Sequence, residues 1–151
     1  MRVHLSDHRF LSAAIAAAIA AAASAQTVIP VTSDIAVSTT WTPNNVYDLQ
    51  RQIYVLPGAT LTIQAGTVLA SSAGVGGSLA VTRGAQIHVQ GTEKQPVIMT
   101  SSADRATWAG GDPKTGTWRE AANEWGNLTL MGAGYVSENA VAGNTPVPSA
   151  T

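Results

Sequence analysis

Residues 57–102 read PGATLTIQAGTVLASSAGVGGSLAVTRGAQIHVQGTEKQPVIMTSS and carry the clearest pattern in the chain. A half-buried strand pattern occurs twice in this stretch, as LTIQAGTVL at 61–69 and as LAVTRGAQIHV at 79–89. In each copy apolar residues alternate with others until a glycine breaks the alternation. This pattern predicts a strand, a tight corner and a second strand. Glycine suits such a corner because it adopts positive φ without a steric penalty.

The two copies superpose without a gap, which places Leu61 on Leu79 and Ile63 on Val81. Repeats of roughly 20 residues built from short strands are typical of β-solenoids. In a solenoid each strand pairs with its counterpart one coil away, so we expect Leu61 to lie over Leu79 and Ile63 over Val81. The predicted fold is all-β, a short right-handed parallel β-helix of about three coils. We also expect Val97 and Met99 to point inward, one coil after Ile53 and Val55.

Four segments, GATLTIQAGTVL, SLAVTRGAQIHVQGT, PVIMTSS and EWGNLTLMG, resemble right-handed parallel β-helix repeats of bacterial secreted and cell-surface proteins. The last segment resembles a Gly-Trp-Gly-Gly-Leu turn found in one such group, which includes an outer-membrane lipoprotein family of leptospires. The chain has no cysteine and therefore lacks that family's lipid attachment residue. The resemblance is specific for the fold and weak for function, because β-helices serve as lyases, hydrolases, adhesins and passive stalks.

The first 25 residues have the features of a cleaved export signal. Arginines lie in a polar start, residues 11–22 form an alanine-rich apolar run, and Ala23-Ser24-Ala25 matches the small-x-small cleavage pattern. We therefore expect cleavage between Ala25 and Gln26. The apolar run is shorter than the roughly 20 residues that span a bilayer, so no transmembrane segment is expected in the mature chain. The predicted location is the cell envelope or the extracellular space.

The rest of the chain divides by pattern into three parts. Residues 26–52 are expected to form an N-terminal cap region, either as an edge strand or as a cover over the first coil. Residues 53–136 are expected to form the coils, with a long projecting loop at 103–124. Residues 137–151 show no periodicity and predict an irregular tail. The pattern leaves two interpretations of the last coil: the chain is the front piece of a longer β-helix, or another chain covers its open end.

No constellation for catalysis is evident. His88 is the one histidine after the proposed leader, and its alternation with Ile87 and Val89 places it on the outer face of a strand. The carboxylates lie mostly in loops, where solvated charges are the simpler explanation than the paired acids of glycoside hydrolysis. We therefore expect no catalytic residue, no cofactor and no metal site. Charged residues make up 11% of the chain and the net charge is −1, so no nucleic-acid partner is expected.

Tryptophans in the 103–125 region are the candidate contact residues. Trp108 and Trp118 are predicted either to stack on sugar rings or a partner surface, or to fold back and pin the loop to the coils. Trp125, at the start of a coil, favours the pinning role. The sequence thus predicts an exported, non-enzymatic structural or interaction protein that contacts a glycan or another surface protein, or self-associates through coil ends. The alternative is a polysaccharide lyase or hydrolase, or a glycan-binding module, with active residues in the 103–124 loop or in missing coils.

Overall fold

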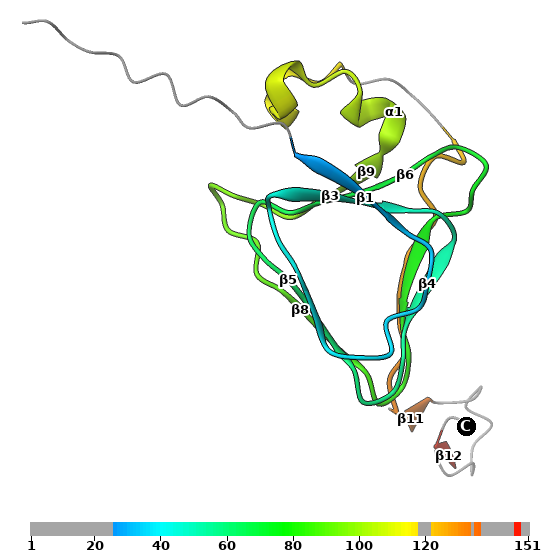
Figure 1. Ribbon diagram of the computed structural model, residues 1–151. Coiled ribbons are helices and arrows are strands. Elements are labelled where there is room, and N and C mark those ends of the chain that lie inside the picture. Colours follow the sequence, from blue (N-terminus) through cyan, green and yellow to red (C-terminus); the bar gives the residue numbers. More distant parts are fainter. Residues whose placement is uncertain (1–25, 118–121, 134, 137–146, 149–151) are drawn as a thin grey trace, which may run out of the picture.

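Short parallel strands wind into a prism with three flat sides, as the computed structural model in Figure 1 shows. The structure describes residues 26–117, 122–133, 135–136 and 147–148. The strands of each side are as follows. Sheet A contains β1 (Thr27–Val31), β3 (Asn45–Leu49), β6 (Val68–Ser71) and β9 (Ile98–Ser101); sheet B contains β4 (Gln52–Val55), β7 (Ser78–Val81) and β10 (Leu128–Leu130); sheet C contains β2 (Thr39–Trp41), β5 (Thr60–Ile63) and β8 (Gln86–Val89).

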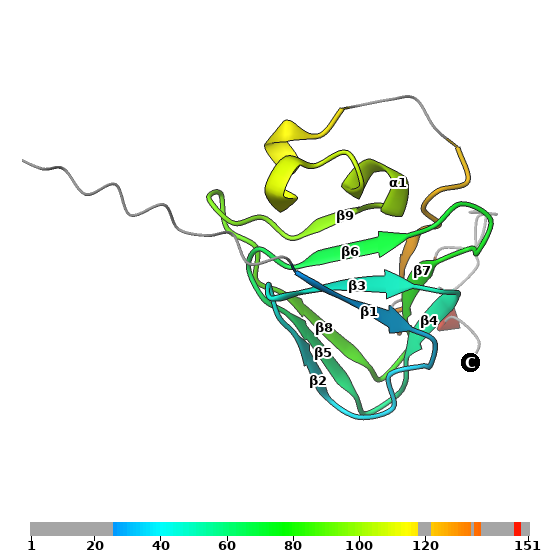
Figure 2. The same ribbon diagram turned by 45° about the horizontal axis from the view of Figure 1, so that its top comes forward.

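The chain visits the sheets in the order A, B, C and then returns to A one layer further along. Every strand pairing within these three sheets is parallel. Figure 2 shows the four strands of sheet A side by side in the order β1, β3, β6, β9. The predicted fold class, a short parallel β-solenoid, is confirmed.

The predicted register is wrong, although the fold is right. Leu61 pairs with Ile87, 26 residues further on (87 − 61), and not with Leu79. Leu79 instead lies between Ile53 and Leu128 in sheet B. The two superposed segments occupy different corners of the prism: the first turns from sheet C to sheet A, and the second from sheet B to sheet C. A strand–glycine–strand pattern looks alike at every corner, so it identifies corners and not coils.

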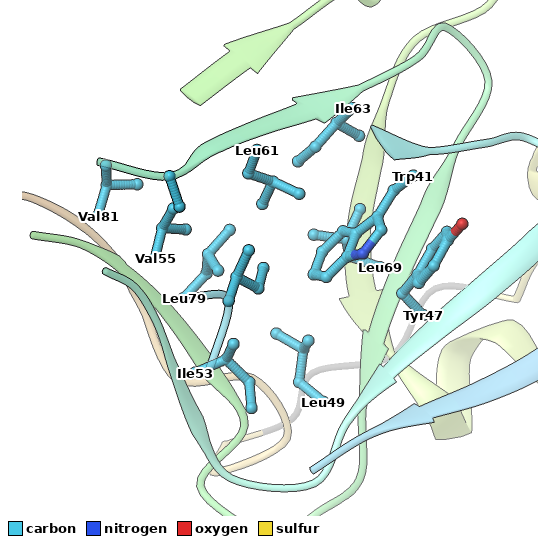
Figure 3. Packing of buried hydrophobic residues seen from close by; sticks show 12 residues of the cluster. Trp41, Tyr47, Leu49, Ile53, Val55, Leu61, Ile63, Leu69, Leu79 and Val81 are labelled. Atoms are coloured by element: carbon cyan, nitrogen blue, oxygen red, sulfur yellow. The ribbon is translucent and has the colours of Figure 1, made fainter. Parts of the chain in front are cut away.

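Inward-facing aliphatic side chains fill the prism (Figure 3). Leu49, Ile53, Leu61, Leu69 and Leu79 are all 0% exposed. They come from all three sheets, so no sheet has a core of its own. Met99 pairs with Leu69, and both Val97 and Met99 pack against this core, as predicted. The coil partner of Met99 is therefore a residue of sheet A and not Ile53 or Val55.

Trp41 and Tyr47 close one corner of the core near its N-terminal end. Their rings stack with centroids 4.5 Å apart and planes inclined by 14°. The Tyr47 hydroxyl accepts hydrogen bonds from the Thr42 backbone N–H at 3.0 Å and the Asn45 side-chain amide at 3.4 Å. The aromatic pair therefore buries its apolar faces while its one hydroxyl keeps polar partners.

Residues 26–52, expected as an N-terminal cap region, contribute strands to the coils. β1 is the edge strand of sheet A and pairs in parallel with β3, while β2 pairs with β5. Between them, Ile35 forms a single bridge with Val55 in sheet B. The first coil therefore has a part in all three sheets, although in sheet B this part is the single residue Ile35. At this end of the prism, β1 is the edge strand of sheet A.

Glycines lie at two of the corners where the chain turns from one sheet to the next. Gly66 has φ +77° and Gly84 has φ +78°, both in the left-handed region predicted for the corners. After the coils, β11 (Tyr135–Val136) pairs antiparallel with β12 (Val147–Pro148), which is the described part of the expected irregular tail. The other residues of 137–151 lie outside the described residues, as do the whole of the proposed leader, 1–25, and Ala25 within it.

The core consists of stacked inward-facing side chains, so the free energy of unfolding depends on individual residues of that core. Replacing Leu61 by alanine removes a fully buried side chain from the layered core and is expected to lower the free energy of unfolding by about 2–5 kcal/mol. Val37, which is 74% exposed, is the control, and Val37→Ala is expected to change it by no more than about 0.5 kcal/mol. Urea denaturation followed by circular dichroism measures both. Equal effects would contradict the assignment of Leu61 to the core.

Candidate functional site

An arm formed by residues 102–117 folds back over the outer face of sheet A and creates the main surface feature of the molecule (Figure 2). The arm begins with the single-turn helix α1 (Ser102–Arg105) and continues through the 3-10 turns η1 (Ala109–Gly111) and η2 (Pro113–Thr115). Ser101 caps α1, because its hydroxyl accepts a hydrogen bond from the Asp104 N–H at 2.9 Å. The strand β9 therefore leads directly into the arm.

A polar contact ties the start of the arm to the middle of sheet A. Asp48 on β3 accepts hydrogen bonds from the Ser102 hydroxyl at 3.2 Å and from the Gln50 side-chain amide at 2.6 Å. Next to it, the Thr100 hydroxyl donates to the Asp104 carboxylate at 2.7 Å. Asp48 and Asp104 therefore both hold the start of the arm in place. Each of them accepts a hydrogen bond from one hydroxyl group.

Apolar packing fixes the middle of the arm. The outward-facing residues Val46, Val68 and Ile98 stand in register across β3, β6 and β9. Trp108 lies on them as part of a second hydrophobic cluster, separate from the core inside the prism, and is 9% exposed. A Cβ atom built on Gly116 would approach the Trp108 indole nitrogen to 2.7 Å, so only glycine fits against the other side of this ring.

A groove of about 760 Å³ runs between the arm and the corner that leads from sheet C to sheet A. Val68, Ile98, Pro96 and Pro113 give it apolar walls. Its charged and amide groups come from both sides and from the residue before β1, and they are Gln26, Glu93, Lys94, Gln95, Asp112 and Lys114. The groove thus offers donors, acceptors and apolar contact to a polar ligand. A second hollow, of about 310 Å³, lies beside Trp125 and is lined largely by glycines of the 74–77 loop.

The four described aspartates accept hydrogen bonds that hold local structure. Asp34 forms an ion pair with Arg51 at 2.9 Å and also accepts the Tyr54 N–H. Asp112 accepts the Lys114 N–H at the start of η2, while Asp48 and Asp104 anchor the arm as described above. In the part of the chain that the structure describes, no three histidines, cysteines or acids lie close enough to hold a metal ion.

The residues singled out from the sequence lie in different places. Gln26 borders the groove, where its side-chain amide donates to the Pro43 carbonyl oxygen at 2.7 Å. Trp108 packs on sheet A, the second of the two alternatives given for it, and Trp125 packs against the core, as its favoured pinning role implies. His88 is exposed on the outer face of β8, as predicted. Trp118 lies outside the described residues.

Sequence reasoning did not find the groove. Its sides come from two loops, 93–96 and 111–114, that carry no periodic pattern. The Asp-Pro pair at 112–113 and the Gln-Pro pair at 95–96 are turn signals that mark each loop separately. The sequence does not indicate that the two turns face each other. The distance between them depends on the packing of Trp108 against sheet A, which positions the arm.

These features can be set beside known proteins. The model of the family described as "Pectate-lyase like beta helix domain" matches residues 33–150, most of the chain. The chain belongs to this family, which includes enzymes. No curated protein matches it, and no solved structure does. In addition, the described residues include no helix of the length and apolar character needed to cross a bilayer.

The packing of Trp108 predicts that the arm can be released without unfolding the coils. Trp108→Ala removes the apolar anchor and is expected to destabilise the protein by about 3 kcal/mol. Amides of the arm should then exchange with solvent faster, while those of β5 and β6 remain protected. Hydrogen–deuterium exchange with mass spectrometry measures this, and Lys114→Ala, an exposed residue of the same arm, is the control. Unchanged exchange in the arm of Trp108→Ala would show that other contacts hold it.

Proposed function

We propose that this chain is an exported, non-enzymatic β-helix protein with a structural or interaction role at the cell envelope or outside the cell. The observation that supports this best is the use of its carboxylates. Asp34, Asp48, Asp104 and Asp112 accept hydrogen bonds that hold turns, a strand edge and the arm. These hydrogen bonds give the four carboxylates a structural use, and we infer that they form neither the acid and base pair of a glycosidase nor a calcium site.

The second candidate function is the binding of a polysaccharide in the groove. The groove volume suits a few sugar units, and amide and charged groups along apolar walls are the mixture that carbohydrate sites use. Lys94 and Lys114 favour an acidic polysaccharide. This function requires no catalytic residue, so it is compatible with the use of the carboxylates described above.

A panel of neutral and acidic polysaccharides, with and without calcium, tests the proposal. The protein is expected to release no reducing ends or unsaturated products, because the proposed role of Asp34, Asp48, Asp104 and Asp112 is structural. Tryptophan fluorescence on the same samples reports binding near the groove, because Trp108 belongs to the same packed cluster as the groove residues Val68 and Ile98. Robust product formation would overturn the non-enzymatic role. Quenching that saturates, and is lost in Lys94→Ala with Lys114→Ala, would establish the second candidate.

Export is tested on the N-terminus of the protein. Gln26 is the first residue of the proposed mature chain. Mass spectrometry of protein recovered from outside the cytoplasm is expected to give a chain that begins at Gln26. Replacement of Ala25 by a bulky residue should block cleavage, since the site requires small side chains. Recovery of the protein in the cytoplasm with residues 1–25 intact would contradict export.

A further inference from the structure

A single Asp-Pro peptide bond lies in the middle of the arm. Asp112 and Pro113 connect η1 to η2, and the sequence contains no second Asp-Pro pair. The nitrogen of an X–Pro bond belongs to a tertiary amide, and it leaves as a basic secondary amine. The aspartate carboxylate can also reach the carbonyl carbon of its own residue by closing a five-membered ring. Its covalent chemistry therefore makes this bond the one in the chain that acid hydrolyses most easily.

The turn that follows the bond holds the carbonyl group of Asp112. Its oxygen accepts two hydrogen bonds from Thr115, one from the backbone N–H at 3.1 Å and one from the hydroxyl at 2.6 Å. The hydroxyl oxygen itself accepts the Ala109 N–H at 2.7 Å, which leaves its hydrogen for the Asp112 carbonyl. Two donors on one carbonyl oxygen stabilise the negative charge that develops there when a nucleophile adds to the carbon.

The same turn holds the groups on both sides of the bond. One carboxylate oxygen of Asp112 accepts the Lys114 N–H at 2.9 Å, and the Asp112 N–H donates to the Ala109 carbonyl oxygen at 3.1 Å. Beyond the bond, the Pro113 carbonyl oxygen accepts the Gly116 N–H at 3.2 Å. The folded arm thus restricts rotations that an unfolded chain must lose before the ring can close, and such restriction accelerates intramolecular reactions.

The charged groups around the bond are those of the groove. Glu93 and Lys94 lie on the opposite side of the groove, and Lys114 lies on the same side as Asp112. Asp112 and Pro113 are both exposed. Solvent can therefore supply what hydrolysis needs, a proton for the proline nitrogen and a water molecule for the carbonyl carbon.

We propose that the folded arm promotes cleavage of its own chain between Asp112 and Pro113 in mildly acidic surroundings. A carboxylate oxygen of Asp112 forms a bond to the carbonyl carbon of the same residue, and the carbonyl electrons move to the oxygen that Thr115 holds. When this intermediate collapses, the C–N bond breaks and the Pro113 nitrogen leaves with the bonding electrons and a proton from solvent. Water then opens the cyclic anhydride, which restores the side chain and gives Asp112 an α-carboxylate.

The two fragments are expected to stay together after cleavage. The first fragment ends at Asp112 and keeps Trp108 packed on sheet A. The second fragment contains β10, which pairs with β7, and the Leu79 N–H donates to the Asn127 carbonyl oxygen at 3.0 Å. Cleavage therefore divides one side of the groove and places a new carboxylate and a new ammonium group there. The reaction takes place once per molecule and uses no external substrate, so it goes beyond the function proposed above.

Intact-mass spectrometry of the full chain, incubated in mildly acidic buffer with and without urea, tests the proposal. The folded protein is expected to split between Asp112 and Pro113 about tenfold faster than the protein in urea, because only the folded arm holds the carbonyl and the carboxylate. Asp112→Asn should abolish this cleavage. Thr115→Val should slow it several-fold, while Thr115→Ser keeps the hydroxyl and should cleave like the wild type.

Thr117→Val, the same replacement two residues further along the arm, is the matched control and should also cleave like the wild type. Circular dichroism confirms that each variant is folded before incubation. Cleavage that is equally fast or faster in urea, or that persists in Asp112→Asn, would overturn the proposal, as would an unchanged rate in Thr115→Val. These outcomes are separate from the test of the proposed function, which measures products released from polysaccharides.

Discussion

The structure depends on the stacking of inward-facing aliphatic side chains in register from one coil to the next. A single coil of three short strands has no second layer of its own on which to pack, so it must place its apolar side chains on those of its neighbours. Leu61 on Ile87 and Ile53 on Leu79 are two such steps, in different sheets and with the same spacing. The parallel hydrogen bonds between strands follow from this stacking, because they form only where the coils are already in register.

A second apolar ladder, on the outside of sheet A, gives the molecule its surface features. Val28, Val46, Val68 and Ile98 stand in line across four strands. Trp108 of the arm covers Val46, Val68 and Ile98, while Val28 at the edge of the sheet is 47% exposed. The groove then exists as a consequence of the arm's position, since one of its sides belongs to the arm and the other to the coil corner at 93–96.

Local features of the structure could be predicted from the sequence, and long-range ones could not. Alternation identified β5 and β7, glycine identified the corners at Gly66 and Gly84, and the β-helix resemblance of EWGNLTLMG identified β10. The predicted register was wrong because the corners of a three-sided prism share one local sequence pattern, while the number of residues per coil varies. Trp41 precedes a turn signal, and nothing local indicates that it stacks on Tyr47 inside the core. The groove was missed for the same reason, as its sides are two loops joined only by folding.

A pair of cysteine replacements tests the central claim of register most directly, because the chain contains no cysteine of its own. Thr62 and His88 are partners on the outer face of sheet C, where neighbouring strands lie about 4.8 Å apart. Cysteines at these two positions are expected to form a disulfide within one chain on mild oxidation, since this spacing falls in the range that disulfides bridge. Cysteines at Thr62 and Ala80, the pair implied by superposing the two sequence copies, are expected to remain reduced. Oxidation of the second pair, with the first left reduced, would contradict the stacking described here.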